Sequence, residues 1–193
     1  MTEQLMETTW RTALWRQFGA TINMLENALV ACPASLWKER LWSEHPDHPL
    51  PPGFPLEFDQ FWSITYHVLF SLDLYLTGSH EGFAPPAPFT LNALNPDSVF
   101  PEQPYTKEEL HGYLGQLRQK CQATIAELSN ERARQPVPFP CLGGNSLSFF
   151  ELQLYSMRHV QEHAAQLSLF LGQHAIPDEA LDWVPWAKEE PGS

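Results

Sequence analysis

The sequence predicts an all-α fold, a four-helix bundle with long proline-rich connections, on the strength of three observations. Apolar residues recur at helical spacing in four stretches of the 193-residue chain. Two of these stretches begin with a hydroxyl residue followed three positions later by Glu, the pattern of a capped helix start. Most of the 18 prolines lie between the stretches, where they exclude regular helix. We therefore expect one bundle domain over residues 1–193.

The chain is acidic, with 11 basic and 23 acidic residues and a net charge of −12. This balance argues against binding to nucleic acid or to an anionic membrane, because phosphate groups attract clustered cations. No run of about 18 uncharged apolar residues occurs, so no transmembrane helix is expected. Three cysteines without a C-x-x-C motif argue against a disulfide framework. Because no secretory leader is visible either, we expect a cytoplasmic protein.

The first helix is expected from Thr9 to about Ala31, with Thr8 or Thr9 as its N-cap. Its apolar stripe repeats every three or four residues and comprises Leu14, Phe18, Ile22, Leu25 and Leu29. The second helix is expected from Leu56 to Gly78, a glycine that suits a left-handed cap. It is apolar on most sides, which places it centrally in the bundle.

Two long loops flank the second helix. Residues 32–55 hold six prolines together with His45 and His48, which we expect to face solvent. Residues 79–105 hold another six prolines and are far longer than the ~2–8 residues usual between bundle helices. A connection of that length can cross the bundle from end to end, so that the flanking helices run parallel, or it can form a lid.

The third and fourth helices are predicted from their capping boxes. Thr106 and Glu109 open the third helix, whose apolar stripe comprises Leu110, Tyr113, Leu114, Leu117, Cys121, Ile125 and Leu128. Ser148 and Glu151 open the fourth helix, and Gly172 is expected to end it.

The remaining cysteines and the tail carry weaker signals. Cys121 lies on an apolar stripe, which indicates a small core residue and not a nucleophile. Cys141 lies in a predicted loop, residues 132–147, and no base stands beside it in the sequence. Trp183 and Trp186 in the tail are expected to pack on the bundle or on a partner subunit.

Three histidines form the candidate site. His159 and His163 are four residues apart on the predicted fourth helix, so their Cβ atoms lie ~5–6 Å apart on one face. Two imidazoles that close can hold one divalent metal ion at ~2.0–2.1 Å each. If the second and fourth helices are neighbours, His67 supplies a third ligand and one coordination position stays open. The alternative is three core histidines that hydrogen-bond within the protein and bind no metal.

Residues that could orient these ligands are Ser71, one turn after His67, and Glu162. Glu162 points ~100° around the helix from its neighbour His163. Asp73 and Glu151 are weaker candidates, because a solvated carboxylate is the usual state. The segment from His159 to His163 also matches the H-x-x-E-H pattern of inverzincin peptidases. Only 30 residues follow it, too few for the larger domain that those enzymes need.

Four features follow one another along the chain: a helix with a central His67, a long crossover, the run YTKEELHGYLGQL, and a final helix with His-x-x-x-His. In this order and layout the chain resembles the DinB-like (DinB/YfiT-like) superfamily of metalloenzymes. The resemblance implies an up-down-down-up bundle in which His67, His159 and His163 bind nickel or zinc. It also implies a homodimer and an activity of the thiol-dependent transferase or isomerase type, with a low-molecular-weight thiol as co-substrate. This chain departs at Gln166, where many relatives carry a further His nearby, so the resemblance leaves its substrate open.

Two functions remain open at this point. The first is a divalent-metal-dependent enzyme of the thiol-dependent transferase or hydrolase type, acting on a small molecule at the open coordination position. The second is a non-catalytic, metal-containing module that binds or senses a small molecule. No residue provides a clear general base, so no catalytic side chain is assigned from the sequence.

Overall fold

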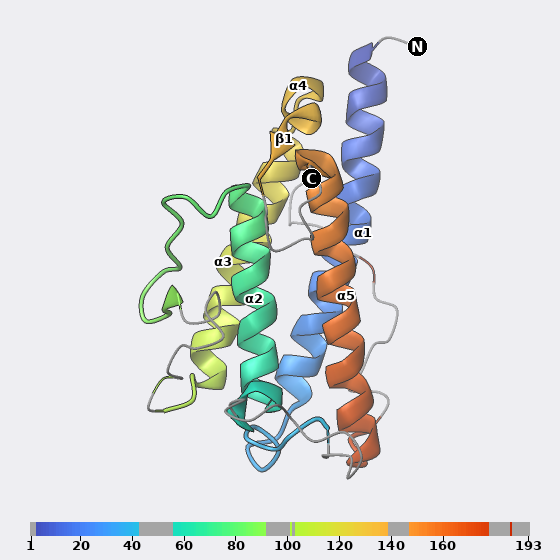
Figure 1. Ribbon diagram of the computed structural model, residues 1–193. Coiled ribbons are helices and arrows are strands. Elements are labelled where there is room, and N and C mark those ends of the chain that lie inside the picture. The colour runs from blue at the N-terminus through green and yellow to red at the C-terminus, as the bar shows by residue number, and fades with distance from the viewer. Residues whose placement is uncertain are drawn as a thin grey trace, which may run out of the picture.

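The computed structural model describes residues 3–42, 56–91, 101, 103–138, 147–177 and 186. Four long helices dominate this part of the chain (Figure 1). They are α1 (Glu3–Ala31), α2 (Phe61–Thr77), α3 (Lys107–Ala126) and α5 (Phe149–Gln173). The short elements are the 3-10 helix η1 (Leu56–Asp59), α4 (Asn130–Arg134), β1 (Pro136–Val137) and β2 (Leu147–Ser148). The predicted all-α class is confirmed.

The long helices form four neighbouring pairs. Both α1 and α2 pack against α3 and against α5. Figure 1 shows α2 and α3 running in the opposite direction to α1 and α5. Because α2 and α3 are parallel, the chain between Thr77 and Lys107 has to return along the length of the bundle. No helix in the described ranges is long and apolar enough to cross a bilayer.

The core is built from the predicted stripes. Every stripe residue expected in the first and third helices is buried, Cys121 included. The largest fully buried side chains come from all four long helices and include Phe18, Trp62, Phe70, Phe149 and Leu110. Each large apolar side chain removed from water stabilises the fold by about 1.5–3 kcal/mol. The hydrophobic effect therefore fixes which faces of the four helices meet.

The helix ends differ from the sequence expectations in three places. The second helix does not begin at Leu56, because Leu56–Asp59 form the 3-10 helix η1 and α2 begins at Phe61. Helix α1 begins at Glu3, so the predicted N-cap at Thr8 or Thr9 is wrong and both residues lie within the helix. Figure 1 shows these first turns projecting past α5, which explains why no apolar periodicity marks them. Helix α5 continues one residue past Gly172, and the positive φ that follows it, 61°, belongs to Ala175.

The capping boxes are confirmed at both predicted helix starts. The Thr106 amide donates to the Glu109 carboxylate at 2.7 Å, and the Glu109 amide donates to the Thr106 hydroxyl at 3.2 Å. Ser148 and Glu151 make the same pair of bonds at 2.8 and 3.2 Å. Each box satisfies backbone N–H groups that a helix start leaves without partners.

The prolines of segment 132–147 predict an irregular loop, but part of the segment is regular structure. It contains the end of α4, and β1 pairs antiparallel with β2 through Pro136 opposite Ser148 and Val137 opposite Leu147. These two-residue strands are too short to leave a periodic pattern in the sequence. The predictions for His45, His48, Cys141 and Trp183 lie outside the described residues.

Gly78 forms the predicted left-handed cap of α2, with φ 81°. A Cβ atom at this position would lie 2.8 Å from the ring of Phe149, the first residue of α5. The guanidinium of Arg132 also lies over the Phe149 ring, 4.3 Å from its centre. Glycine is therefore needed here twice, for the backbone angle and for the close approach of two helix ends.

Asp73 ties α2 to α3 inside the protein. Its carboxylate accepts a hydrogen bond from the Tyr113 hydroxyl at 2.6 Å and forms an ion pair with the Lys120 ammonium at 2.5 Å. Asp73 is 6% exposed, so the expectation of a solvated carboxylate is wrong. Burial and this hydrogen bond to Asp73 raise the pKa of Tyr113, which stays a neutral donor. A buried carboxylate with these two partners holds the two parallel helices at one height.

Trp186 contacts α1 through its backbone, because the side-chain amide of Asn23 donates a hydrogen bond to the Trp186 carbonyl. Trp186 as a whole is 74% exposed, so its side chain does not pack on the described part of the same chain. The alternative expectation, packing on a partner subunit, stays a prediction.

Candidate metal centre

Helices α2 and α5 bring the three predicted histidines together. The Nε2 atoms of His67 and His159 lie 3.2 Å apart, and the Nε2 atoms of His159 and His163 are also 3.2 Å apart. One ligand nitrogen from each of the three rings can be chosen so that all three lie within 4.8 Å of one another. The condition set by the sequence, that the second and last long helices be neighbours, is met because α2 packs on α5.

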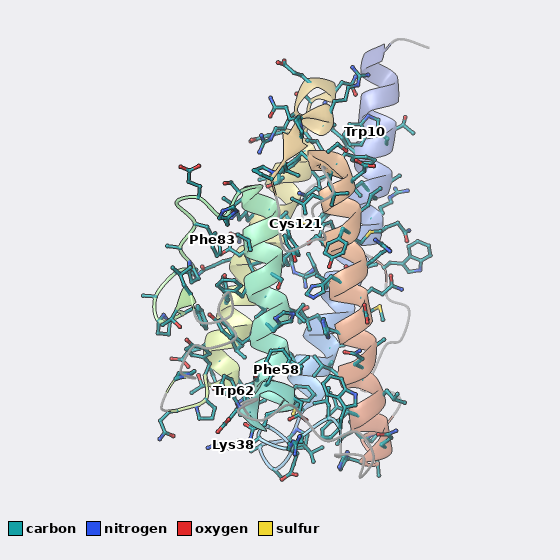
Figure 2. The ribbon with its side chains drawn as sticks, in the orientation of Figure 1. Trp10, Lys38, Phe58, Trp62, Phe83 and Cys121 are labelled. Carbon is teal, nitrogen blue, oxygen red and sulfur yellow. The ribbon has the colours of Figure 1, made fainter. Side chains whose placement is uncertain are left out.

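The position of His67 is unusual for its helix. Of the 17 residues of α2, 15 are buried, and the two exceptions are His67 and the terminal Thr77. His159 and His163 are likewise only partly buried. The ring of Phe58 in η1 lies 6.2 Å from that of His67 and is 40% exposed. Figure 2 shows Phe58 at the lower end of α2, near Trp62. The three histidines therefore lie at the edge of the buried core and not at its centre.

Hydrogen bonding alone does not explain this arrangement. A ring nitrogen carries either one proton or one lone pair, so His159 Nε2 can make one good hydrogen bond, yet it faces two other Nε2 atoms at 3.2 Å. Two nitrogens bound at ~2.0–2.1 Å to a tetrahedral ion are separated by about 3.3 Å. The observed spacing matches that value. The donor set fits a divalent metal ion such as zinc or nickel.

The environment keeps the three imidazoles neutral. Burial, with the nearby His163, lowers the pKa of His67 from 6.5 to about 4. Burial and the two neighbouring rings lower the pKa of His159 to about 3. The pKa of His163 is also lowered by burial, although its contact with Gln166 and the charge of Glu162 oppose the shift. At pH 7 each ring therefore has a free lone pair for a metal, with no proton to displace.

Gln166 fixes the orientation of one ring. Its side-chain oxygen lies 2.7 Å from Nδ1 of His163, one turn back on α5. Since an amide oxygen accepts, the proton of His163 is on Nδ1 and the lone pair of Nε2 points into the cluster. Two tyrosines surround His159: the ring of Tyr155 stacks on it at 6.3 Å, and that of Tyr75 meets it edge-on at 6.2 Å.

Most of the chain matches a known protein family. A model of the DinB superfamily matches residues 17–167 of the chain, a range that includes all three histidines. The chain belongs to the DinB superfamily. No curated protein matches it. The resemblance noted in the sequence is therefore confirmed at the level of the superfamily.

The other residues proposed around the site of this DinB-superfamily protein have different surroundings. Ser71 is buried one turn beyond His67, and its role in orienting that ligand stays a prediction. Glu162 is exposed, and its effect on the site is the charge it places near His163. Glu151 belongs to the capping box and Asp73 to the contact with α3, so neither reaches the cluster. Sequence reasoning missed Gln166, although its i+3 spacing from His163 allowed the contact.

Acid is expected to destabilise the metal-free DinB-superfamily protein through this cluster. The unfolded chain protonates its histidines near pH 6.5, whereas folding holds the pKa of His67 at about 4 and that of His159 at about 3. The unfolded state thus binds more protons between these values, and stability falls as the pH falls from 6.5 toward 4. The expected slope is about 1.4 kcal/mol per pH unit for each imidazole.

The measurement is urea unfolding of metal-free protein at several pH values. The range from 6.5 to 5 isolates the histidines, because ordinary carboxylates titrate below it. A His67→Gln variant should show a shallower slope than the wild type. A Ser168→Ala variant, which changes a buried residue of α5 without removing a titratable group, should keep the wild-type slope. Equal stability at pH 6.5 and pH 5 would contradict this account.

Proposed function

We propose that this protein binds one divalent metal ion, zinc or nickel, through His67, His159 and His163. The single observation that supports this most strongly is the convergence of three neutral imidazoles, with two Nε2 pairs at 3.2 Å. We further propose that the four long helices form the up-down-down-up bundle of one domain spanning residues 1–193, with long proline-rich loops between the helices.

The chain's own residues prepare the site before any ion arrives. Burial holds the rings neutral, and Gln166 fixes the tautomer of His163. An ion held by three imidazoles would act as a Lewis acid with a fourth position open to water or substrate. The partial burial of the three histidines and the 40% exposure of Phe58, whose ring lies 6.2 Å from that of His67, support access of a small molecule to that position.

We propose an enzyme of the thiol-dependent transferase or hydrolase type that acts with a low-molecular-weight thiol. Two features of the described residues support an external nucleophile. Cys32 and Cys121 are buried free cysteines, and burial raises the pKa of Cys32 to about 12 and that of Cys121 further, so neither supplies a thiolate. Among the described residues, no imidazole of the three donates a hydrogen bond to a carboxylate, so no carboxylate is held beside the cluster as a general base. A thiol that binds as co-substrate would supply the nucleophile.

The alternative function is a non-catalytic module that binds or senses a small molecule at the metal. The lack of a described general base is also compatible with this alternative. A homodimer, a cytoplasmic location and the absence of nucleic-acid or membrane binding stay predictions from the sequence and the superfamily.

The experiment starts from metal-free protein titrated with Zn²⁺, Ni²⁺ and Co²⁺, with Co²⁺ as the spectroscopic probe. We expect one ion per chain. A panel of small thiols is then added to the Co²⁺ form, and a sulfur-to-cobalt absorption band would report a thiolate at the open position. Absence of stoichiometric binding would overturn the metal site. Binding with no thiol band would overturn the thiol-dependent enzyme.

Turnover separates the two functions. The Zn²⁺ and Ni²⁺ forms are incubated with each thiol and an electrophilic acceptor, and consumption of the thiol is followed. Metal-dependent turnover supports the enzyme. A thiol band with no turnover for any acceptor supports the binding or sensing module.

A further inference from the structure

Three buried polar atoms on α5 have no hydrogen-bond partner within the described residues. They are Oε1 of Gln153, Oγ of Ser156 and Nδ1 of His159. Gln153 and Ser156 are 0% exposed. A buried polar atom without a partner is costly, and native proteins satisfy more than 90% of such groups with protein atoms or ordered water. Three such atoms at successive i+3 positions of one helix indicate ordered water along this side of α5.

The helix places these atoms in a row. Residues 153, 156 and 159 are three apart, so each step moves about 4.5 Å along the axis and about 60° around it. The far end of the row is anchored, because Nε2 of Gln153 donates to the carbonyl of Tyr75 on α2 at 3.0 Å. That bond identifies the amide nitrogen and leaves Oε1 free to accept from another donor. The near end of the row is the histidine that faces both other ligands.

We propose that ordered water, held by Ser156 and Gln153, accepts the Nδ1 proton of His159 and thereby positions this ring for metal binding. This inference rests on the proposed metal site, because a metal on Nε2 requires the proton to be on Nδ1. The chemistry balances. The ends of the row lie about 9 Å apart along the axis, so two water molecules are needed. One accepts from Nδ1–H of His159 and bonds to the Ser156 hydroxyl, and the second bonds to the same hydroxyl and donates to Oε1 of Gln153.

The two histidines of α5 are thus oriented in different ways. His163 has a direct partner in Gln166 at 2.7 Å. His159 has a water-mediated partner one turn toward the start of the helix. Ser156 acts through the water and the ring, so it is a positioning residue and takes no part in the chemistry.

The test compares four proteins: the wild type, Ser156→Ala, Gln166→Ala as the positive comparator and Ser168→Ala as the control. Ser168 is a buried serine of the same helix, 5% exposed. We expect Ser156→Ala and Gln166→Ala to weaken Zn²⁺ binding by about 10–100-fold, the usual effect of losing a group that orients a ligand. Ser168→Ala should bind as the wild type does.

A spectroscopic readout separates positioning from general damage. In Zn²⁺-loaded, ¹⁵N-labelled wild type, the Nδ1–H of His159 should be visible by NMR and exchange slowly with solvent. In Ser156→Ala it should exchange faster, while the melting temperature of the metal-free form stays within the range of the Ser168→Ala control. A Gln153→Met variant should show the same change from the other end of the row.

The outcomes distinguish this inference from the metal site itself. A wild-type chain that binds no metal overturns both. A wild type that binds metal, with Ser156→Ala of equal affinity and unchanged exchange, overturns the inference alone. A high-resolution crystal structure with no water between Ser156 and His159 would also overturn it.

Discussion

Replacing His159 by alanine is expected to abolish stoichiometric metal binding. His159 is the central ligand, since its Nε2 lies 3.2 Å from the Nε2 atoms of both His67 and His163. A four-ligand zinc site contributes about 10–16 kcal/mol, roughly 3 kcal/mol for each ligand, so losing one weakens binding by more than about 100-fold. Calorimetric titration of metal-free protein with Zn²⁺ and metal analysis after dialysis measure the effect.

The matched control for this change is His111→Ala. His111 lies on α3 with 51% of its side chain exposed and contacts Glu26 at 3.3 Å, away from the cluster. Its removal should leave affinity and stoichiometry unchanged. His67→Ala and His163→Ala should each reduce affinity as His159→Ala does. Wild-type affinity in the His159→Ala protein would show that the ion, if bound, is held elsewhere.

Replacing Asp73 by alanine is expected to cost about 3 kcal/mol of unfolding free energy. The change leaves the Tyr113 hydroxyl and the Lys120 ammonium without their buried partner, 2.6 and 2.5 Å away in the wild type. Breaking a buried ion pair from one side costs about 3–5 kcal/mol. The lower value applies here because the Lys120 side chain is 38% exposed and water can take over part of its solvation.

Urea unfolding at pH 7 measures this loss. Glu162→Ala is the control, because Glu162 is an exposed carboxylate and such surface changes usually stay within about 0.5 kcal/mol. The folded Asp73→Ala protein should still bind one metal ion. A loss below about 1 kcal/mol would mean that the contact between α2 and α3 does not depend on this ion pair.

The sequence was sufficient for those features that depend on local spacing. Helical periodicity identified the buried stripes of α1 and α3, and the two capping boxes identified the starts of α3 and α5. The pair His159 and His163 followed from i,i+4 spacing alone. The addition of His67 needed more, because it depends on which helices are neighbours, and there the superfamily resemblance supplied the missing constraint.

Features that depend on contacts between distant segments were not predictable in this way. Asp73 looked like a surface carboxylate because its partners Tyr113 and Lys120 come from another helix. The start of α1 at Glu3 was missed because those turns extend past α5 and carry no apolar stripe in the sequence. Gln166 was missed because an amide on a helix is common, and only the orientation of the His163 ring gives it a role.

The contact between Gly78 and Phe149 sets the vertical register of the two antiparallel helices that carry the histidines. From this shared point, His67 lies eleven residues down α2 and His159 lies ten residues down α5. At 1.5 Å per residue the two residues lie about 15–17 Å from it along their helices, which is why the rings meet at the same level. Inserting a single residue between His67 and Gly78 would turn the imidazole by about 100° and lift it out of reach. The close contact between these two helix ends thus determines the level at which His67 and His159 meet.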